Sequence, residues 1–165
     1  MGQIKKQKKI YSRPKKPYDT ARFQKEDAFM KNFGLRRKKE IWRAESVLRN
    51  FRIRAKELLA SPNEKKETEL FSKLNKMGIT VEKLDDILGI RVENILSRRL
   101  QSVICTKKIA GTPFEARQLI VHGHVLIDGK RMFYPGLIVT RDMESVIGLD
   151  ERTKTRLISK EEKTE

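Results

Sequence analysis

The stretch 112–133 constrains the fold of this chain more than any other part of its sequence. Thr112 and Glu115 form a capping box, with a proline between them at the first helical position, which predicts a helix of about ten residues. Farther on, Asp128 and Gly129 separate two short apolar runs, and an Asp-Gly pair in that setting predicts a β-hairpin with a type I′ turn. A helix followed at once by a hairpin places the chain in the α+β class.

The sequence on either side of this stretch predicts further elements. Residues from Val92 to about Thr106 have the apolar spacing of one amphipathic helix, with Arg98 and Arg99 near its middle. After the hairpin, residues 137–139 form a short apolar run that predicts another strand, and residues 144–149 are a candidate for one more. The C-terminal half therefore combines helices with a small sheet.

The N-terminal half is predicted to be helical, and its clearest helix covers residues 38–60. Apolar residues recur there every three or four positions, which places them on one stripe that can enter a core. Nine basic side chains lie in or beside this helix against three acidic ones, so its other face is predicted to contact phosphate and not only solvent. The nine basic residues are Arg36, Arg37, Lys38, Lys39, Arg43, Arg49, Arg52, Arg54 and Lys56.

Two neighbouring helices have recognisable ends. Thr20 is placed to cap a helix that runs to about residue 33, where Gly34 suits the position after the last turn. Ser61 and Glu64 have the spacing of a second capping box, with Pro62 at the predicted first helical position. A further short helix is expected before residue 89.

Positive charge is concentrated at the front of the chain. The formal net charge is +16, and residues 1–60 hold 19 basic and 6 acidic side chains. Such a surface repels itself, and the usual compensation is a polyanion whose counterions are released on binding. Nucleic acid is the leading candidate partner, and an anionic membrane surface is the alternative. Residues 1–18 contain too little apolar surface to fold alone, and we expect them to become ordered against the charged partner through Lys5, Lys6, Lys8, Lys9, Arg13, Lys15 and Lys16.

Several classes of protein are disfavoured. No apolar run approaches the roughly 20 residues of a membrane helix, and the basic N-terminus lacks the apolar stretch of a secretory signal. The single Cys105 excludes an intrachain disulfide and makes a structural zinc site improbable, so we expect a reducing cytosol, no metal and no cofactor. The sequence contains no P-loop, metalloprotease or nucleophile-elbow pattern, so we expect no enzymatic activity.

Four segments carry a resemblance to a known family. Arg98 to Gln101, the run EARQLIVHGHVLIDGK at 115–130, and residues 135–139 together resemble the S-four RNA-binding domain, a module of two helices and a β-hairpin. The run KNFGLRRKKEIWRAESVLRNFRIRAKELL at 31–59 resembles the helical region that precedes this module in the archaeal and eukaryotic branch of the small-subunit ribosomal protein four family. The resemblance covers nearly the whole chain.

The resemblance implies an organisation and a function. Composition separates a basic extension at 1–18 and a charged tail at 151–165, and the tail matches no feature of the family. Between them, the resemblance implies a basic helical domain that binds ribosomal RNA at 19–93 and an S-four-like module at 94–150. It implies a structural constituent of the small ribosomal subunit in the cytoplasm, which binds small-subunit ribosomal RNA, nucleates assembly and supports translation near the messenger entry path. Neighbouring ribosomal proteins are implied partners, and messenger RNA is a further candidate. The RNA-facing positions of the module that it carries over are Arg98, Arg99, Lys107, Lys108, Thr112, Arg117, Gln118, His122, His124 and Lys130.

Two departures and three alternatives accompany this interpretation. Asp128 stands where the family's hairpin often has Asn, and the zinc-binding cysteines of some bacterial members are absent. The closest alternative is a ribosome-assembly factor of the same family, which sedimentation with precursor particles would reveal. A general nucleic-acid chaperone is the second. An RNA-modifying enzyme is the weakest, because it needs a catalytic domain and the remaining residues form basic helices.

Overall fold

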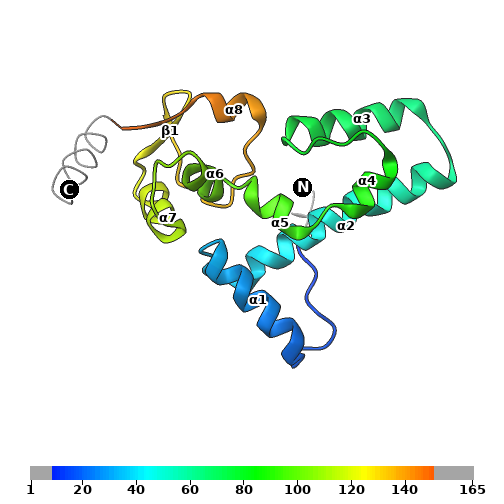
Figure 1. Cartoon of the computed structure of the whole chain (residues 1–165), viewed down its shortest axis with the longest axis horizontal. Helices are drawn as coiled ribbons and strands as arrows, with labels where there is room; N and C mark the ends of the chain where they lie inside the picture. Colours follow the sequence, from blue (N-terminus) through cyan, green and yellow to red (C-terminus); the bar gives the residue numbers. More distant parts are fainter. Residues whose placement is uncertain (1–8, 151–165) are drawn as a thin grey trace, which may run out of the picture.

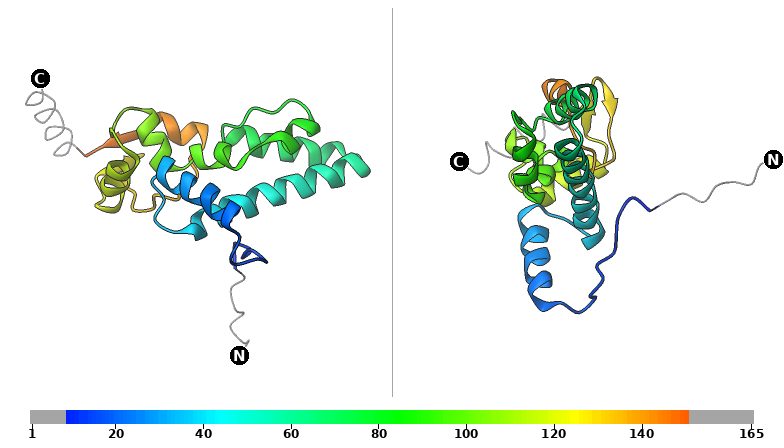
Figure 2. Two further views of the ribbon diagram at one scale, coloured as in Figure 1. Left: turned by 60° about the horizontal axis from the view of Figure 1, so that its bottom comes forward. Right: turned by 90° about the vertical axis from the view of Figure 1, so that its right-hand side faces the viewer.

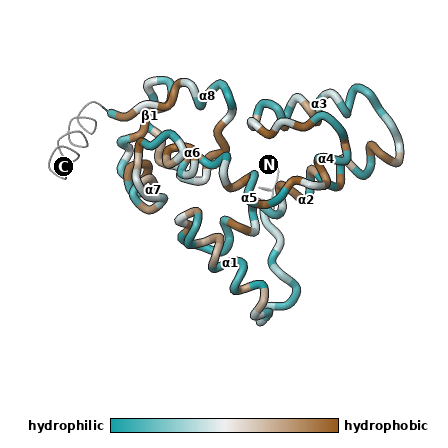
Figure 3. Tube along the Cα trace, in the orientation of Figure 1, coloured by the Kyte–Doolittle hydropathy of each residue, from teal (hydrophilic) through white to brown (hydrophobic). Residues whose placement is uncertain are grey.

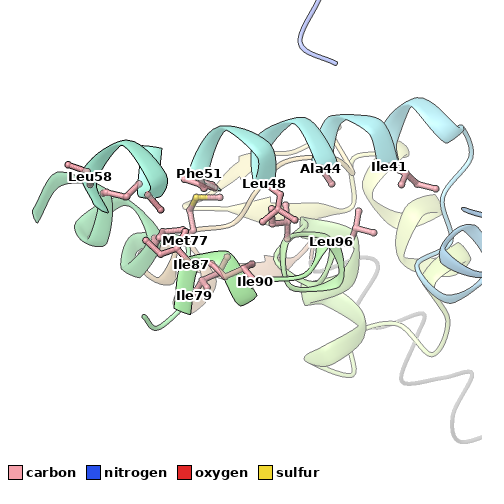
Figure 4. Packing of buried hydrophobic residues seen from close by; sticks show 14 of the residues in the cluster. Ile41, Ala44, Leu48, Phe51, Leu58, Met77, Ile79, Ile87, Ile90 and Leu96 are labelled. Atoms are coloured by element: carbon pink, nitrogen blue, oxygen red, sulfur yellow. The ribbon is translucent and has the colours of Figure 1, made fainter. Parts of the chain in front are cut away.

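Helix α2 (Lys38–Ala60) is the main support of the N-terminal part, and its bounds agree with the sequence prediction. The computed structural model describes residues 9–150. The apolar stripe of α2 is buried along its whole length, from Ile41 to Leu58 (Figure 4). It packs against α3 (Glu64–Lys76), α4 (Leu84–Gly89) and α5 (Val92–Ser97), while α1 (Thr20–Asn32) lies beside its first half (Figures 1 and 2).

The helix ends differ from prediction by one or two residues. Asp19, not Thr20, caps α1, because its carboxylate accepts the backbone N–H of Arg22. In the same way Asn63 caps α3 by accepting the N–H of Lys66, so Pro62 precedes the helix instead of opening it. In both cases an Asx side chain lies within two residues of the predicted cap, and such side chains cap helices at least as well as Ser or Thr.

The single helix predicted from Val92 to Thr106 is wrong. The chain leaves the helical conformation between α5 and α6 (Leu100–Thr106), where Arg99 is extended, with φ −75° and ψ 147°. There the backbone N–H of Leu100 donates to Leu137 O at 2.8 Å, and the N–H of Val139 donates to Arg98 O at 2.9 Å. The segment predicted as a strand at 137–139 thus forms only an isolated antiparallel bridge, between Ile138 and Arg99. Hydrogen bonds from distant residues override the local helical pattern.

The hairpin is confirmed. β1 (Val125–Ile127) pairs antiparallel with β2 (Lys130–Arg131), and Asp128 and Gly129 have φ +52° and +72°, the two positive values that a type I′ turn requires. β3 (Ile147–Leu149) lies within the candidate strand 144–149 and adds to the other edge of β1, with strand order β2-β1-β3. It follows a short helix, α8 (Arg141–Ser145), which includes the first two residues of that predicted region.

Two hydrophobic cores hold the chain together, and the fold is α+β as predicted. One core lies under α2, and the second joins α6, α7 (Pro113–Val121) and the sheet. Figure 1 shows these two parts at opposite ends of the molecule, connected through α5. Apolar and polar residues alternate along the helices (Figure 3), and no helix among residues 9–150 is long and apolar enough to cross a membrane.

The described part of the basic extension is anchored to α2, which the sequence did not predict. The Tyr11 ring lies 6.0 Å from the Trp42 ring, and the backbone N–H of Ser12 donates to the Ser46 hydroxyl at 3.2 Å. The expectation that this segment becomes ordered only against a partner is therefore wrong for residues 11 and 12. Residues 1–8 and the tail 151–165 lie outside the described residues.

Gly34 is a position where a side chain should disrupt the fold. Its φ is +57°, and a Cβ atom there would lie 2.7 Å from Pro113 Cβ and 2.8 Å from Gln101 Nε2. We expect Gly34→Ala to cost about 1 to 3 kcal/mol of unfolding free energy, measured by denaturant titration. The control is Gly89→Ala, where the added Cβ meets nothing within 4 Å, and it should be neutral or slightly stabilising.

The Tyr11 contact should be measurable as stability. Tyr11→Ala removes a half-buried ring from Trp42 and should cost about 1 kcal/mol, detected as a lower melting temperature. Tyr18→Ala is the matched control, because Tyr18 is 90% exposed. Equal melting temperatures for the two variants would show that the extension is not anchored in solution.

Candidate nucleic-acid interface

The buried amide of Gln101 joins the two parts of the molecule. Gln101 is 1% exposed, and its Nε2 donates to three backbone carbonyls: Phe33 O at 3.1 Å, Gly34 O at 2.9 Å and Pro113 O at 2.8 Å. These oxygens belong to the end of α1, the loop after it and the start of α7. The amide therefore connects the helical part to the C-terminal module at one point.

Beside this point, Glu40 lies between two arginines of the module. Its Oε2 accepts from Arg99 Nη2 at 2.5 Å, and its two oxygens accept from Arg117 Nη2 and Nη1 at 3.1 and 3.3 Å. Arg99 is only 6% exposed and Glu40 is half-buried. Burial alone would raise the pKa of the Glu40 carboxyl, but the hydrogen bonds from Arg117 and Arg99 outweigh it and hold that pKa below the usual value. We call these three residues the Glu40 clamp.

A groove of about 650 Å³ opens over the clamp, between the start of α2 and the segment 134–138. Four exposed cations line it, and Tyr134, which is 72% exposed, stands on its other wall. The residues that define this basic groove are Arg36, Arg37, Lys39, Arg43 and Tyr134. The structure thus places four of the cations that were predicted to bind RNA, all from the α2 segment, opposite the loop 134–138 of the module.

The remaining cations of the α2 segment divide into two groups. Arg49, Arg54 and Lys56 are exposed. Arg52 instead donates from Nη2 to Ile90 O at 2.7 Å, and Lys38 is paired with Glu26 and Asp27 at 3.4 and 3.2 Å. These last two therefore have bonds within the fold.

The predicted residues of the module also divide. Arg98 pairs with Glu144 at 2.7 Å, Lys107 donates to the backbone oxygen of Glu144, and the Thr112 hydroxyl caps α7. Lys108, Gln118, His122 and Lys130 are exposed, and the His122 and His124 rings lie parallel, 6.1 Å apart. Of the extension, Lys9, Arg13, Lys15 and Lys16 are exposed, while Lys5, Lys6 and Lys8 lie outside the described residues.

Three residues of this surface were not predicted. Arg131 is exposed on β2, and Tyr134 is exposed immediately before the Pro-Gly turn. An exposed aromatic beside a turn in a basic chain is a usable signal for base stacking, which the sequence analysis passed over. Glu40 was noted only as one of three acids near α2. Within residues 9–150 no cluster of three metal-ligating side chains is present.

Comparison with known proteins identifies the family. The family model described as the S4 domain matches residues 98–144. The small ribosomal subunit protein uS4 of Sulfurisphaera tokodaii is 44% identical over 154 residues, covering 89% of this chain and 86% of that protein. The proteins of the same name from Hyperthermus butylicus and Ignicoccus hospitalis are 42% and 44% identical, covering 89% and 90% of this chain and 86% and 92% of their own lengths. The chain belongs to the uS4 family.

Membership in the uS4 family confirms the resemblance read from the sequence. The matched S4 domain contains α6, α7, the hairpin and most of α8, and two members of the Glu40 clamp. Proteins of the uS4 family are ribosomal structural proteins, so the chain is not an enzyme.

The pH dependence of stability should reveal the clamp. The pKa of Glu40 is lowered in the folded chain, so its contribution to stability is complete above about pH 4.5, the usual glutamate value, and is lost as pH falls through the lower folded value. Glu40→Gln should therefore reduce the free energy of unfolding more at about pH 7 than at about pH 3. The measurement is denaturant unfolding of both proteins at both pH values, and equal differences would contradict the clamp.

Proposed function

We propose that the chain is a structural protein of the small ribosomal subunit that binds small-subunit ribosomal RNA. The observation that carries this proposal is the basic groove, in which four exposed cations from the α2 segment face Tyr134 of the module. Proteins commonly bind unpaired RNA with cations that contact the phosphate backbone and an aromatic ring on which a base stacks. The uS4 relatives, whose name places them in the small ribosomal subunit, support the same partner.

The proposed contacts follow exposure. The exposed side chains are assigned to phosphates or bases: Lys9, Arg13, Lys15, Lys16, Arg36, Arg37, Lys39, Arg43, Arg49, Arg54, Lys56, Lys107, Lys108, Gln118, His122 and Lys130, with Lys5, Lys6 and Lys8 predicted from the sequence alone. Lys107 is included because it is exposed, although it also donates to the Glu144 backbone oxygen. The other predicted residues are bonded within the chain or half-buried, and we assign them to shaping this surface: Lys38, Arg52, Arg98, Arg99, Thr112, Arg117 and His124.

The proposal also includes the domain organisation of the chain and its position in the small ribosomal subunit. The two cores support the division into a helical RNA-binding domain at 19–93 and a module at 94–150, flanked by the extension 1–18 and the tail 151–165. A surface this basic, spread over both parts, suits a protein that joins separate RNA segments early in assembly. A position near the messenger entry path and contacts with neighbouring proteins and messenger RNA complete the proposal. Sedimentation tests residency: the chain should be found in mature small subunits and not only in precursors.

Binding should depend steeply on salt. Each phosphate neutralised contributes a slope of roughly −0.7 to −0.9 to the plot of log affinity against log salt, and the basic groove alone offers four cations. Titration of a small-subunit ribosomal RNA transcript at several salt concentrations measures the slope. A flat response would refute phosphate binding, and equal affinity for a random duplex would favour a general chaperone.

Loss of groove cations should lower both affinity and slope. We expect the double variant Arg36→Gln and Arg43→Gln to weaken binding by about 1 to 3 kcal/mol. The slope of log affinity against log salt should become less steep by the amount that two phosphate contacts contribute. Lys76→Gln is the matched control for one charge, because Lys76 is exposed at the end of α3, within residues 61–93, where 6 basic side chains are balanced by 7 acidic ones. Similar losses per charge at both places would show that only total charge matters.

A further inference from the structure

We propose that Glu40 is a positioning residue for RNA binding, which holds the module against α2 so that the two walls of the basic groove face one RNA strand. This inference rests on the proposed function. Glu40 belongs to the first turn of α2, whereas Arg99 and Arg117 belong to the S4 domain, so their bonds cross from one part of the molecule to the other.

The geometry of the contact suits a fixed orientation. Arg117 donates two hydrogen bonds to the two oxygens of Glu40, and Arg99 donates a third from another direction. Such a forked pair tolerates little rotation, because both N–H groups must keep their alignment. Arg117 also lies 3.4 Å from Gly34 O and from Gln101 Oε1, which connects the clamp to the buried amide.

The charge of Glu40 requires an explanation of this kind. A carboxylate on the lining of a groove that binds a polyanion repels its ligand, and simple electrostatics predicts that removing it strengthens binding. Arg99 and Arg117 would, without Glu40, be two like charges close together in a partly buried site. Glu40 neutralises this repulsion and, through its bonds to both arginines, holds the module against α2.

The sign of the effect of Glu40→Gln therefore tests the proposal. The full chain carrying this change should bind a small-subunit ribosomal RNA transcript about tenfold more weakly, although it is more positive. Its salt slope should be unchanged, because no phosphate contact is removed. The control, Glu57→Gln, removes the same charge from an exposed position on α2, and its affinity should be unchanged or higher.

A second variant separates positioning from instability. Arg117→Lys keeps the positive charge but cannot form the forked pair, so it should weaken RNA binding without changing the salt slope. The relative orientation of the two parts can be measured as the distribution of distances between labels at Ser72→Cys on α3 and Thr106→Cys on α6, in a Cys105→Ser background. This distribution should be broader in both clamp variants than in the unaltered chain when RNA is absent. The double variant of Glu40→Gln with Arg117→Lys should bind no more weakly than Glu40→Gln, because both changes break the same bond.

The outcomes are distinct. If the unaltered chain binds the transcript and folded Glu40→Gln binds as well or better, the positioning inference is wrong. A reduced salt slope for Arg117→Gln, which removes the charge, would assign Arg117 to a phosphate and also overturn the inference. If the unaltered chain does not bind the transcript, the proposed function itself fails.

Discussion

A carboxylate between two arginines determines how this molecule presents its charge. The chain has two separate cores, and each one packs its own helices, so burial of apolar surface alone leaves their relative orientation weakly determined. Hydrogen bonds, which are directional, determine this relative orientation. Glu40 and Gln101 cross the junction with hydrogen bonds from buried or half-buried groups, where an unmade bond is costly. The groove above them exists because these bonds hold its walls in place.

This arrangement divides the cations of a very basic chain into two kinds. Arg99, Arg117 and Arg98 are directed inward to carboxylates, and each of them stabilises a contact between distant segments. Most of the remainder stay exposed, where mutual repulsion lowers stability and favours a polyanionic partner. Net charge therefore overstates the number of cations available to RNA, since a paired guanidinium has already given its hydrogen bonds to a carboxylate.

The basic extension shows how one aromatic residue changes the role of a segment. Composition predicts that residues 1–18 do not fold by themselves, and residues 9–18 contain no core of their own. Tyr11 nevertheless packs on Trp42 of α2, so part of the extension follows the surface of the helical part instead of leaving it. Lys9, Arg13, Lys15 and Lys16 are thereby held near the other cations of the N-terminal part, which supports their assignment to one RNA-binding surface.

The sequence by itself determined the features that depend on neighbouring residues. The α2 stripe, the Thr112 cap and the type I′ turn at Asp128-Gly129 follow from spacing and backbone preference, and the family followed from the same runs. Only the tertiary structure decided the break between α5 and α6, where residues 137–139 bind the backbone at 98–100, and the inward direction of Arg99 and Arg117. Their partner Glu40 is 59 and 77 residues away, and no periodic pattern encodes a bond across that separation. The direction of a charged side chain depends on what the fold brings beside it.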